Sequence, residues 1–580
     1  MNRILDWFRQ DKRYVVWGKA LLLALLPFLC CAVTTAAQGK GIGEVYLPAS
    51  EWNDELFYYK QVENIVNFGF PQGYFGFNES HGLVLSFAAW SPVLVLPWIL
   101  WGLVFGWNFM APVVCNILLM TAAVFLFMLL VRPTWKQMGI FTILFCLYTP
   151  FVRYMLSGMP EIICISHLIV FYGLVYSYGR EEKRWKLAGM FVLSGLLTLM
   201  RPYMLLFLLL PDFFLLRGMR KKGKLLAGLF GAAGVTGAVL LGYALIKHYL
   251  GAEYFHPLFF TDWITVFFTD GFGAGVHNFF GTLYWKGKDF GAHMTQGLRT
   301  GLASGAFFAG YLVTLAVLCW QSAADYRKWR RISRGTDDAK EDGAKKAVQV
   351  GTQVGTQFRT QVGTQAGTQV GTQVGTQLVA EAHLAFSFVG MLFALLLMYK
   401  LTEGSKHLLT FMAVAVFVIS LMDTRFFKKA VLVGACFAYL YTYKAVDPYD
   451  YQVPYVTTER QMQVEDWKRR FADALALTGE NVPNYDNSVI WVFNEQSKAG
   501  ATMKWQLLYA LPEGFGISCC QSDHVLEHID ELQSRYLAAQ NGAAVDERCA
   551  AAGWTELQRD EDMVLYERPS QTALSAPAPY

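Results

Sequence analysis

The feature that most constrains this chain is a series of long apolar runs separated by short, mostly basic segments. A helix needs about 20 apolar residues to cross the hydrocarbon core of a bilayer. Runs near that length occur at residues 18–37, 108–131, 137–156, 162–178, 186–200, 203–216, 225–249, 302–320, 383–400, 405–422 and 428–446. Only 16% of the residues are charged, against about 25% in soluble proteins. The predicted fold class is therefore a polytopic α-helical membrane protein of about eleven spans.

The basic residues between the runs predict the orientation of the chain. Short cytoplasmic loops carry an excess of lysine and arginine. With a cytoplasmic N-terminus, every basic cluster falls on the cytoplasmic side, at 132–136, 180–186, 217–224, 327–334 and 425–429. The outer segments are then 38–107, 157–161, 250–301 and 447–580. We interpret the first run as a retained helix, although basic residues followed by an apolar run also resemble a signal peptide. The expected location is a plasma membrane, in a bacterial cell.

Two segments are predicted not to span. Residues 83–106 contain two prolines and several tryptophans, which favours an interfacial hairpin on the outer surface. Residues 350–377 repeat a Val-Gly-Thr-Gln unit within the predicted cytoplasmic loop 321–382. Glycine and threonine disfavour a helix, so we expect a disordered linker, with stacked β-structure as the alternative.

From about residue 447 the chain regains a soluble composition. Residues 488–493 and 563–568 read as strands, and residues 523–540 as an amphipathic helix. This predicts two parts, a membrane domain at 1–446 and a small extracytoplasmic α/β domain at 447–580. The three cysteines of the second part are expected to form one disulfide or to remain free thiols: Cys519, Cys520 and Cys549.

The first outer loop contains a group of carboxylates beside aromatic residues, Glu-Trp-Asn-Asp-Glu-Leu-Phe-Tyr-Tyr at 51–59. A carboxylate near the membrane surface, such as Asp54 or its neighbour Glu55, could act as general base towards an acceptor hydroxyl. The alternative is that these two residues only begin a surface helix, because acidic side chains favour a helix N-terminus.

Three further ionisable residues are predicted near the outer ends of spans. Glu161 follows a Ser-Gly-Met-Pro turn, and Arg153 precedes it on the same side. Arg201 lies directly before Pro202, where the proline predicts a break between two short helices. Such groups either carry function or form structural ion pairs. A guanidinium at this place either binds a lipid phosphate or extends to the interface.

The outer segment 250–301 adds Lys286, Lys288 and Arg299 among aromatic residues. These cations either engage a phosphate or contact anionic lipid headgroups. Neither the histidines nor the cysteines have the spacing of a metal site. The net charge of +4 gives no indication of a nucleic-acid partner.

Four motifs in one order resemble the GT-C superfamily of membrane glycosyltransferases, which includes protein O-mannosyltransferases and aminoarabinose transferases. The resemblance covers roughly the first 300 residues. The C-terminal domain matches only in placement and general type. The motifs are Asn-Asp-Glu-Leu-Phe-Tyr (53–58), Trp-Ser-Pro (90–92), Ser-Gly-x-x-Glu (157–161) and Leu-Met-Arg-Pro (199–202).

The resemblance implies a polyprenyl-phosphate sugar as donor and a lipid, glycan or protein as acceptor on the outer face. Asp54 would be the general base, with Glu55 beside it, and Glu161 would position a sugar. The donor phosphate would be held by Arg201, joined by Lys286, Lys288 and Arg299. Supporting residues would be Arg153, Tyr58 and His81.

The chain also departs from the family pattern. The Trp-Ser-Pro segment lacks paired prolines, and the second acidic residue is glutamate where aspartate is common. The Trp-Trp-Asp-Tyr-Gly type of signature is absent, so no essential metal or other cofactor is predicted. Phosphate is a good leaving group, so one base and stabilisation of the departing charge would suffice for direct, inverting displacement.

Two other classes remain open from the sequence. A lipid or glycolipid flippase also has many spans and buried charges, but should show repeated halves, which the runs do not. A polysaccharide polymerase or ligase uses similar donors but usually carries its arginines in large outer loops.

Overall fold

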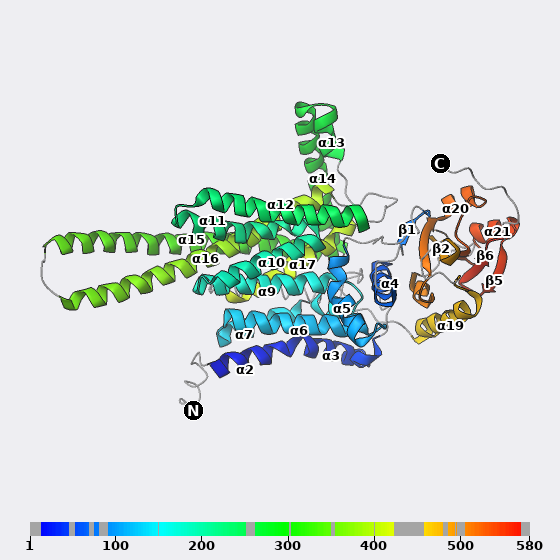
Figure 1. Cartoon of the computed structure of the whole chain (residues 1–580), viewed down its shortest axis with the longest axis horizontal. Helices are drawn as coiled ribbons and strands as arrows, with labels where there is room; N and C mark the ends of the chain where they lie inside the picture. Colours follow the sequence, from blue (N-terminus) through cyan, green and yellow to red (C-terminus); the bar gives the residue numbers. More distant parts are fainter. Residues whose placement is uncertain are drawn as a thin grey trace.

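The computed structural model consists of a long helical bundle with a small α/β domain at one end (Figure 1). It describes residues 13–45, 53–68, 75–79, 91–148, 150–250, 262–300, 303–349, 354–398, 401–422, 458–478, 485–493, 495 and 505–569. The N-terminal end of the bundle points away from the domain.

The bundle is built from the predicted apolar runs. Its elements are α2 (Arg13–Ala24), α3 (Leu26–Ala37), α6 (Ala111–Val131), α7 (Trp135–Leu147), α8 (Pro150–Met155), α9 (Glu161–Arg180), α10 (Arg184–Met200), η3 (Pro202–Leu208), α11 (Leu209–Lys221), α12 (Leu225–Leu250), α15 (Ala303–Gln349), α16 (Val354–Met398) and α17 (Leu401–Leu421). Within the described ranges, seven helical stretches are long and apolar enough to cross a membrane. The chain is thus a multi-span helical membrane protein, as predicted. The run at 428–446 lies outside the described residues.

The predicted break at Pro202 is present. Helix α10 ends at Met200, and the 3-10 helix η3 begins at Pro202. Arg201 between them has extended backbone angles, φ −146° and ψ 120°. Proline disfavours the helical conformation in the residue before it, which explains why the helix ends there.

The described part of the segment 83–106 forms η2 (Pro92–Val95) and α5 (Leu96–Phe105). In Figure 1, α5 lies across the domain end of the bundle and not along it. Ser91 begins η2 by accepting a hydrogen bond from the Val93 amide at 3.2 Å. The apolar helical segment Pro92–Phe105 is shorter than a full span, and its place at the outer membrane surface stays a prediction. The first half of the predicted hairpin lies outside the described residues.

The expectation of a disordered linker at 350–377 is wrong for residues 354–377, which belong to helix α16. The repeat unit of four residues is close to the helical period of 3.6, so its apolar positions follow one slowly turning face. The glycines also permit close packing. A Cβ on Gly375 would lie 3.1 Å from Trp329 of α15, and one on Gly179 of α9 would lie 2.8 Å from Thr376. Small residues at helix contacts are typical of membrane bundles.

The C-terminal domain contains a mixed six-stranded sheet in the order β1-β3-β2-β4-β6-β5. Strands β2 (Ser488–Phe493) and β6 (Met563–Glu567) are the two predicted from sequence, and they are joined by β3 (Gly516–Gln521), β4 (Tyr536–Gln540) and β5 (Thr555–Arg559). One face packs on α19 (Thr458–Ala474) and η5 (Trp505–Ala510), and the other on α20 (Ser522–His528) and α21 (Ala544–Ala551).

The single helix predicted at 523–540 is wrong. Helix α20 ends at His528, and residues Tyr536–Gln540 form the buried strand β4. Its apolar residues divide between both faces of the sheet, with Tyr536 and Ala538 on one and Leu537 and Ala539 on the other. A strand buried on both faces gives a continuous apolar run, which periodicity does not distinguish from a helix. The described cysteines are free thiols. Burial raises the pKa of Cys520 and Cys549 to about 12.

The edge strand β1 (Phe75–Phe77) comes from the first loop of the membrane domain, far from the predicted range 447–580. It pairs in parallel with β3, Phe75 opposite Ile517. The two residues after it, Asn78 and Glu79, have φ of 52° and 56°. This turn directs the Glu79 carboxylate to the Gln533 and Ser534 amides, at 2.9 and 2.7 Å. The first loop therefore supplies the edge strand of the C-terminal sheet and is hydrogen-bonded to the domain.

We expect Glu79→Ala to loosen this attachment. Removing the carboxylate leaves two amides without their charged acceptor, and one charged hydrogen bond is worth about 1.5–3 kcal/mol. Amide hydrogen exchange at Phe75–Phe77 in the full chain should accelerate by at least about tenfold. Glu44→Ala, which removes an exposed carboxylate from the same loop, is the control. Equal exchange in the two variants would show that β1 does not depend on Glu79.

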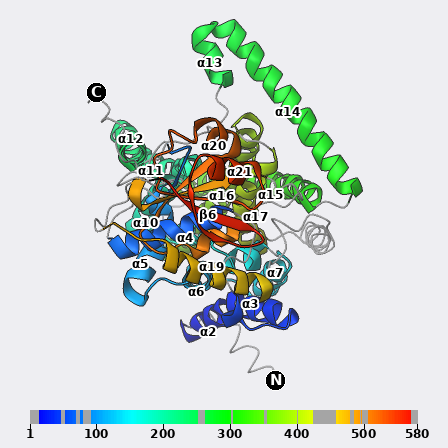
Figure 2. The same ribbon diagram turned by 90° about the vertical axis from the view of Figure 1, so that its right-hand side faces the viewer.

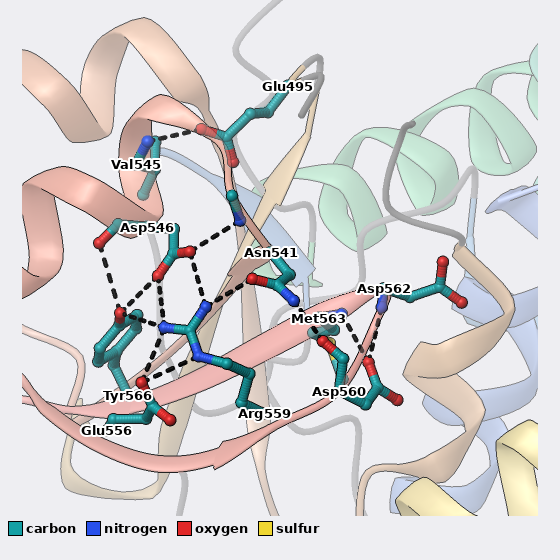
Figure 3. Close-up of polar contacts among 11 residues, drawn as sticks. Glu495, Asn541, Val545, Asp546, Glu556, Arg559, Asp560, Asp562, Met563 and Tyr566 are labelled. Atoms are coloured by element: carbon teal, nitrogen blue, oxygen red, sulfur yellow. Dashed lines mark hydrogen bonds and ion pairs between the residues drawn. The ribbon is translucent and has the colours of Figure 1, made fainter. Parts of the chain in front are cut away.

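A polar cluster fixes the far edge of the domain (Figure 3). Arg559 donates to both oxygens of Asp546 at 2.9 Å, and Tyr566 donates to Asp546 at 2.5 Å. Nearby, the Glu495 carboxylate accepts the Val545 amide at the start of α21, at 2.7 Å. Carboxyl ends of parallel strands are common ligand sites. Here the carboxylate of Glu495, which follows β2, fills the position at the strand end where such a ligand would bind.

The Asp546 cluster predicts loss of domain stability in acid. Burial alone would raise the pKa of Asp546, but hydrogen bonds from Arg559, Tyr566 and Gly542 outweigh it and hold the pKa below its usual value of 3.8. This contribution is therefore present above that usual value and is lost as the pH falls through the lower, folded pKa. Asp546→Asn should cost about 2 kcal/mol at neutral pH, seen as faster exchange in β4 and β6. Glu556→Gln, at the exposed side of Arg559, should cost less than about 1 kcal/mol. Equal effects would contradict the assignment.

Candidate functional site

The candidate site lies where helix α4 (Asn53–Phe68) is held between the bundle and the C-terminal domain. The helix has two apolar faces because both of its sides are covered. Leu56, Phe57 and Tyr59 belong to the core shared with the domain. Tyr58, Val62 and Ile65 belong to the core of the bundle. The start of α4, with its carboxylates, is thus positioned by both parts of the molecule.

Polar residues of α4 strengthen its contact with the domain. The Lys60 ammonium donates to the Leu511 carbonyl at 2.6 Å and pairs with Glu63 at 2.8 Å. Burial raises the pKa of Glu63, although Lys60 acts in the opposite direction. The Trp107 indole donates to the Tyr59 carbonyl at 3.0 Å. These bonds add polar contacts to the apolar packing of α4.

The predicted acidic pair lies in the first turn of α4, and its two members differ in environment. Glu55 is buried and pairs with Arg153 of α8 at 3.6 Å, with both side chains only 1% exposed. Asp54 is partly exposed. Both carboxylates lie where the helix dipole favours negative charge. The residues begin a helix, as one interpretation from sequence expected, but that helix packs on both the bundle and the domain. The general-base role of Asp54 or Glu55 stays a prediction.

A second buried ion pair joins the other two predicted residues. Glu161 accepts from Arg201 at 2.6 Å, and both side chains are 1% exposed. Glu161 is the first residue of α9, so the helix dipole also stabilises its charge. Its second oxygen, Oε2, has no hydrogen-bond partner among the described residues. The pair is therefore compensated in charge, while one carboxylate oxygen can accept a further bond.

Two residues around Arg201 were missed by the sequence analysis. Arg201 donates from Nη1 to the Tyr203 hydroxyl at 3.0 Å and to Nδ1 of His407 at 3.2 Å. A guanidinium can only donate, so Nδ1 of His407 acts as acceptor, and a neutral His407 carries its proton on Nε2. The sequence signal was a histidine within the apolar run 405–422, where ionisable residues are rare.

Asn116 connects the elements that carry the two pairs, and it was also missed. Its amide donates to the carbonyls of Tyr154 and Ser157 at 3.3 and 3.0 Å. Its carbonyl accepts from the Trp98 indole at 2.9 Å. The turn between Arg153 and Glu161 is thus fixed to α5 and α6. On α4, the Tyr58 side chain is near enough to interact with the charge of Arg201.

The remaining predicted residues lie elsewhere. Lys286, Lys288 and Arg299 are on helix α14 (Phe272–Thr300), which packs against α13, α15 and α16. The Lys288 ammonium lies 5.0 Å from the ring of Trp285. The structure does not place these cations against the Arg201 pair, and His81 lies outside the described residues. No group of three or more His, Cys, Asp or Glu side chains suited to a metal ion occurs in the described ranges.

Comparisons with known proteins give one structural likeness. No family model matches the chain, and no curated protein sequence matches it. Among solved structures, the chain is similar to the Archaeoglobus fulgidus oligosaccharyltransferase, whose crystal structure is a complex with zinc and sulfate. The identity is 12%, the TM-score is 0.42, and the match covers 95% of this chain and 73% of that one. A likeness at this level assigns neither a family nor an activity to the chain.

Proposed function

We propose that this chain is a membrane glycosyltransferase that moves a sugar from a polyprenyl-phosphate donor to an acceptor at the domain end of the bundle. The observation that carries the proposal is the pair of buried carboxylate–arginine contacts, Glu55–Arg153 and Glu161–Arg201, beneath the start of α4. Burying an ion pair costs free energy because both charges lose their hydration. Ionisable residues inside a membrane domain often mark a functional site.

The environments of the two neighbouring carboxylates suggest different roles. Asp54 is the more exposed one and is assigned as general base, while Glu55 fixes α4 to α8 through Arg153. In the proposed step, Asp54 takes the proton of the acceptor hydroxyl as its oxygen bonds to the anomeric carbon. The bond from that carbon to the phosphate oxygen breaks, and the phosphate leaves with the electron pair. A single displacement of this kind inverts the anomeric centre.

The second ion pair is assigned to the donor. Arg201 already has a charge partner in Glu161, so it is proposed to contact the departing phosphate together with the Nε2 proton of His407, and not alone. Donors aimed at developing negative charge stabilise a transition state strongly in a water-poor site. Glu161, through its second oxygen, is proposed to accept from a sugar hydroxyl.

We infer the sidedness from the basic loops. Those between α6 and α7, α9 and α10, and α11 and α12 lie at the bundle end opposite the domain. Short loops rich in lysine and arginine remain in the cytoplasm. The domain and the candidate site are therefore proposed to face outward, towards a lipid-linked donor. At the carboxyl end of β2, the Glu495 carboxylate already accepts the Val545 amide. This place therefore gives no support to binding of a soluble nucleotide-sugar donor.

A flippase for a lipid-linked sugar is the second candidate, because a separate polar cluster lies inside the bundle. Glu381 is fully buried in α16 and accepts from Gln377 at 2.9 Å. Asp325 of α15 accepts from Gln321 at 2.8 Å. Part of the predicted cytoplasmic loop 321–382 therefore lies within the bundle. Buried carboxyls of this kind also occur along transport pathways.

The deciding experiment uses the purified full chain in lipid vesicles with radiolabelled polyprenyl-phosphate sugars and a panel of lipid, glycan and protein acceptors. Transfer with inversion at the anomeric carbon would support the enzyme, and retention would overturn single displacement. Movement of donor between leaflets without transfer to any acceptor would support the flippase. The matched variant Glu381→Gln should then reduce movement, whereas for the transferase it should leave transfer within about threefold of wild type.

A further inference from the structure

The hairpin of α13 (Asp262–Thr269) and α14 is separate from the candidate site and carries a large exposed aromatic surface. Phe272, Phe280 and Tyr284 are 78%, 61% and 65% exposed, and Phe268 is 84% exposed. Soluble surfaces rarely show contiguous apolar patches of this kind. The spacing of four and eight residues places the three side chains of α14 along one side of the helix.

The orientation of α14 relative to the spans indicates that lipid covers this aromatic surface. Seen along the bundle axis in Figure 2, α14 lies in the plane of the view and extends outward beside the bundle. Figure 1 shows it crosswise to the spans, at the level where α12 ends and before the domain begins. A helix perpendicular to the spans at their ends lies in the plane of a membrane surface.

The contacts of the hairpin hold it in that orientation. At its C-terminal part, α14 packs on the bundle through Phe290 and Phe308 of α15, whose ring centroids are 4.9 Å apart. Among the described residues, its N-terminal part packs on α13, where the ring centroids of Trp263 and Phe279 lie 5.3 Å apart. The spans also carry exposed apolar side chains of the kind that face lipid, such as Phe230 and Leu241 of α12 at 78% and 60%.

The charges of α14 fit the same environment. Lys286, Lys288 and Arg299 give it a positive charge against a single acidic residue, Asp289. Lysine and arginine beside aromatic rings are typical of helices at a bilayer interface, where the cations meet anionic headgroups. The ammonium of Lys288 over the ring of Trp285 is one such arrangement.

We propose that the α13–α14 hairpin is a membrane-surface anchor on the domain side of the bundle. Phe272, Phe280 and Tyr284 face the acyl chains of the lipids, and the basic residues contact anionic headgroups. This assigns Lys286, Lys288 and Arg299 to bulk lipid and not to the donor phosphate. The inference does not depend on the proposed glycosyltransferase activity.

The test places a photoreactive benzoylphenylalanine at position 280 of the full chain in nanodiscs of mixed neutral and anionic phospholipid. The matched control carries the same residue at position 289, nine residues on and therefore on the opposite side of the helix. Both positions are exposed, so neither replacement should disturb folding. After illumination, lipid adducts are counted by mass spectrometry.

We expect the lipid adduct at position 280 to exceed that at 289 by on the order of tenfold, because the apolar side of such a helix is the one that enters the acyl region. Equal yields at the two positions would overturn the proposal. Adducts at 280 formed mainly with protein, either a second copy or the C-terminal domain, would also overturn it and identify a protein partner instead.

Discussion

Asp54→Asn should reduce sugar transfer by about 10²–10⁴-fold, the range attributed to a general base. Asparagine keeps the shape of the side chain and the start of α4, but it cannot take a proton from the acceptor. Binding of the polyprenyl-phosphate sugar should remain within about threefold of wild type, because the donor is assigned to Arg201 and His407. The measurements are single-turnover transfer and equilibrium donor binding with the purified full chain.

The control for this prediction is Glu63→Gln on the same helix. Glu63 faces the domain beside Lys60. Burial raises the pKa of Glu63 and so favours its neutral form. Transfer should therefore stay within about threefold. If Asp54→Asn transferred sugar normally while Glu55→Gln abolished transfer, the roles of the two neighbours would be reversed. If neither variant lost transfer, α4 would not carry the base.

Breaking the Glu161–Arg201 pair should have the largest effect on stability. Each side chain is 1% exposed, so Glu161→Gln or Arg201→Met leaves the other charge buried and unpaired. Such a loss costs about 3–5 kcal/mol. The double variant should be less destabilised than the sum of the single ones, because it leaves no lone charge. Thermal unfolding of the full chain in detergent measures all three, and Arg201→Met should also weaken donor binding.

An exposed pair serves as control for that prediction. Asp466 and Arg469 on α19 lie 3.0 Å apart with side chains 38% and 78% exposed. Asp466→Asn should change stability by no more than about 1 kcal/mol. Additive effects of Glu161→Gln and Arg201→Met would mean that the two residues do not interact. A stable Arg201→Met that still binds donor would remove Arg201 from the site.

The membrane part of the fold was predictable because each span is specified by its own composition. Apolar runs and the proline after Arg201 were sufficient to place the described spans and the break in the right segments. Position 201 itself was identified as a candidate for the same reason, since a charge among apolar residues stands out. In the domain, β2 and β6 were recognised from their β-branched and aromatic content.

The pairing of the site residues was not predictable. Glu161 and Arg201 are 40 residues apart, and nothing local to either one specifies the other. His407 and Asn116 were hidden in apolar runs, and their roles follow only from the helix packing around them. The prediction of a disordered linker for the Gly-Thr-Gln tract was wrong for a different reason. Single-residue propensity argued against a helix, whereas residues 354–377 are helical, with close packing at Gly375 and Thr376.

The origin of β1 has a consequence for the synthesis of the chain. Asn78 and its partner Gln521 are 443 residues apart, so a ribosome adding 5–20 residues per second needs about 20–90 s to reach the second after the first. During that time, the intervening spans are made and inserted into the membrane while the early strand remains unpaired. A chain that stopped before residue 516 would lack β3 and expose an open strand segment. The complete sheet can therefore form only after translation and membrane insertion have both finished.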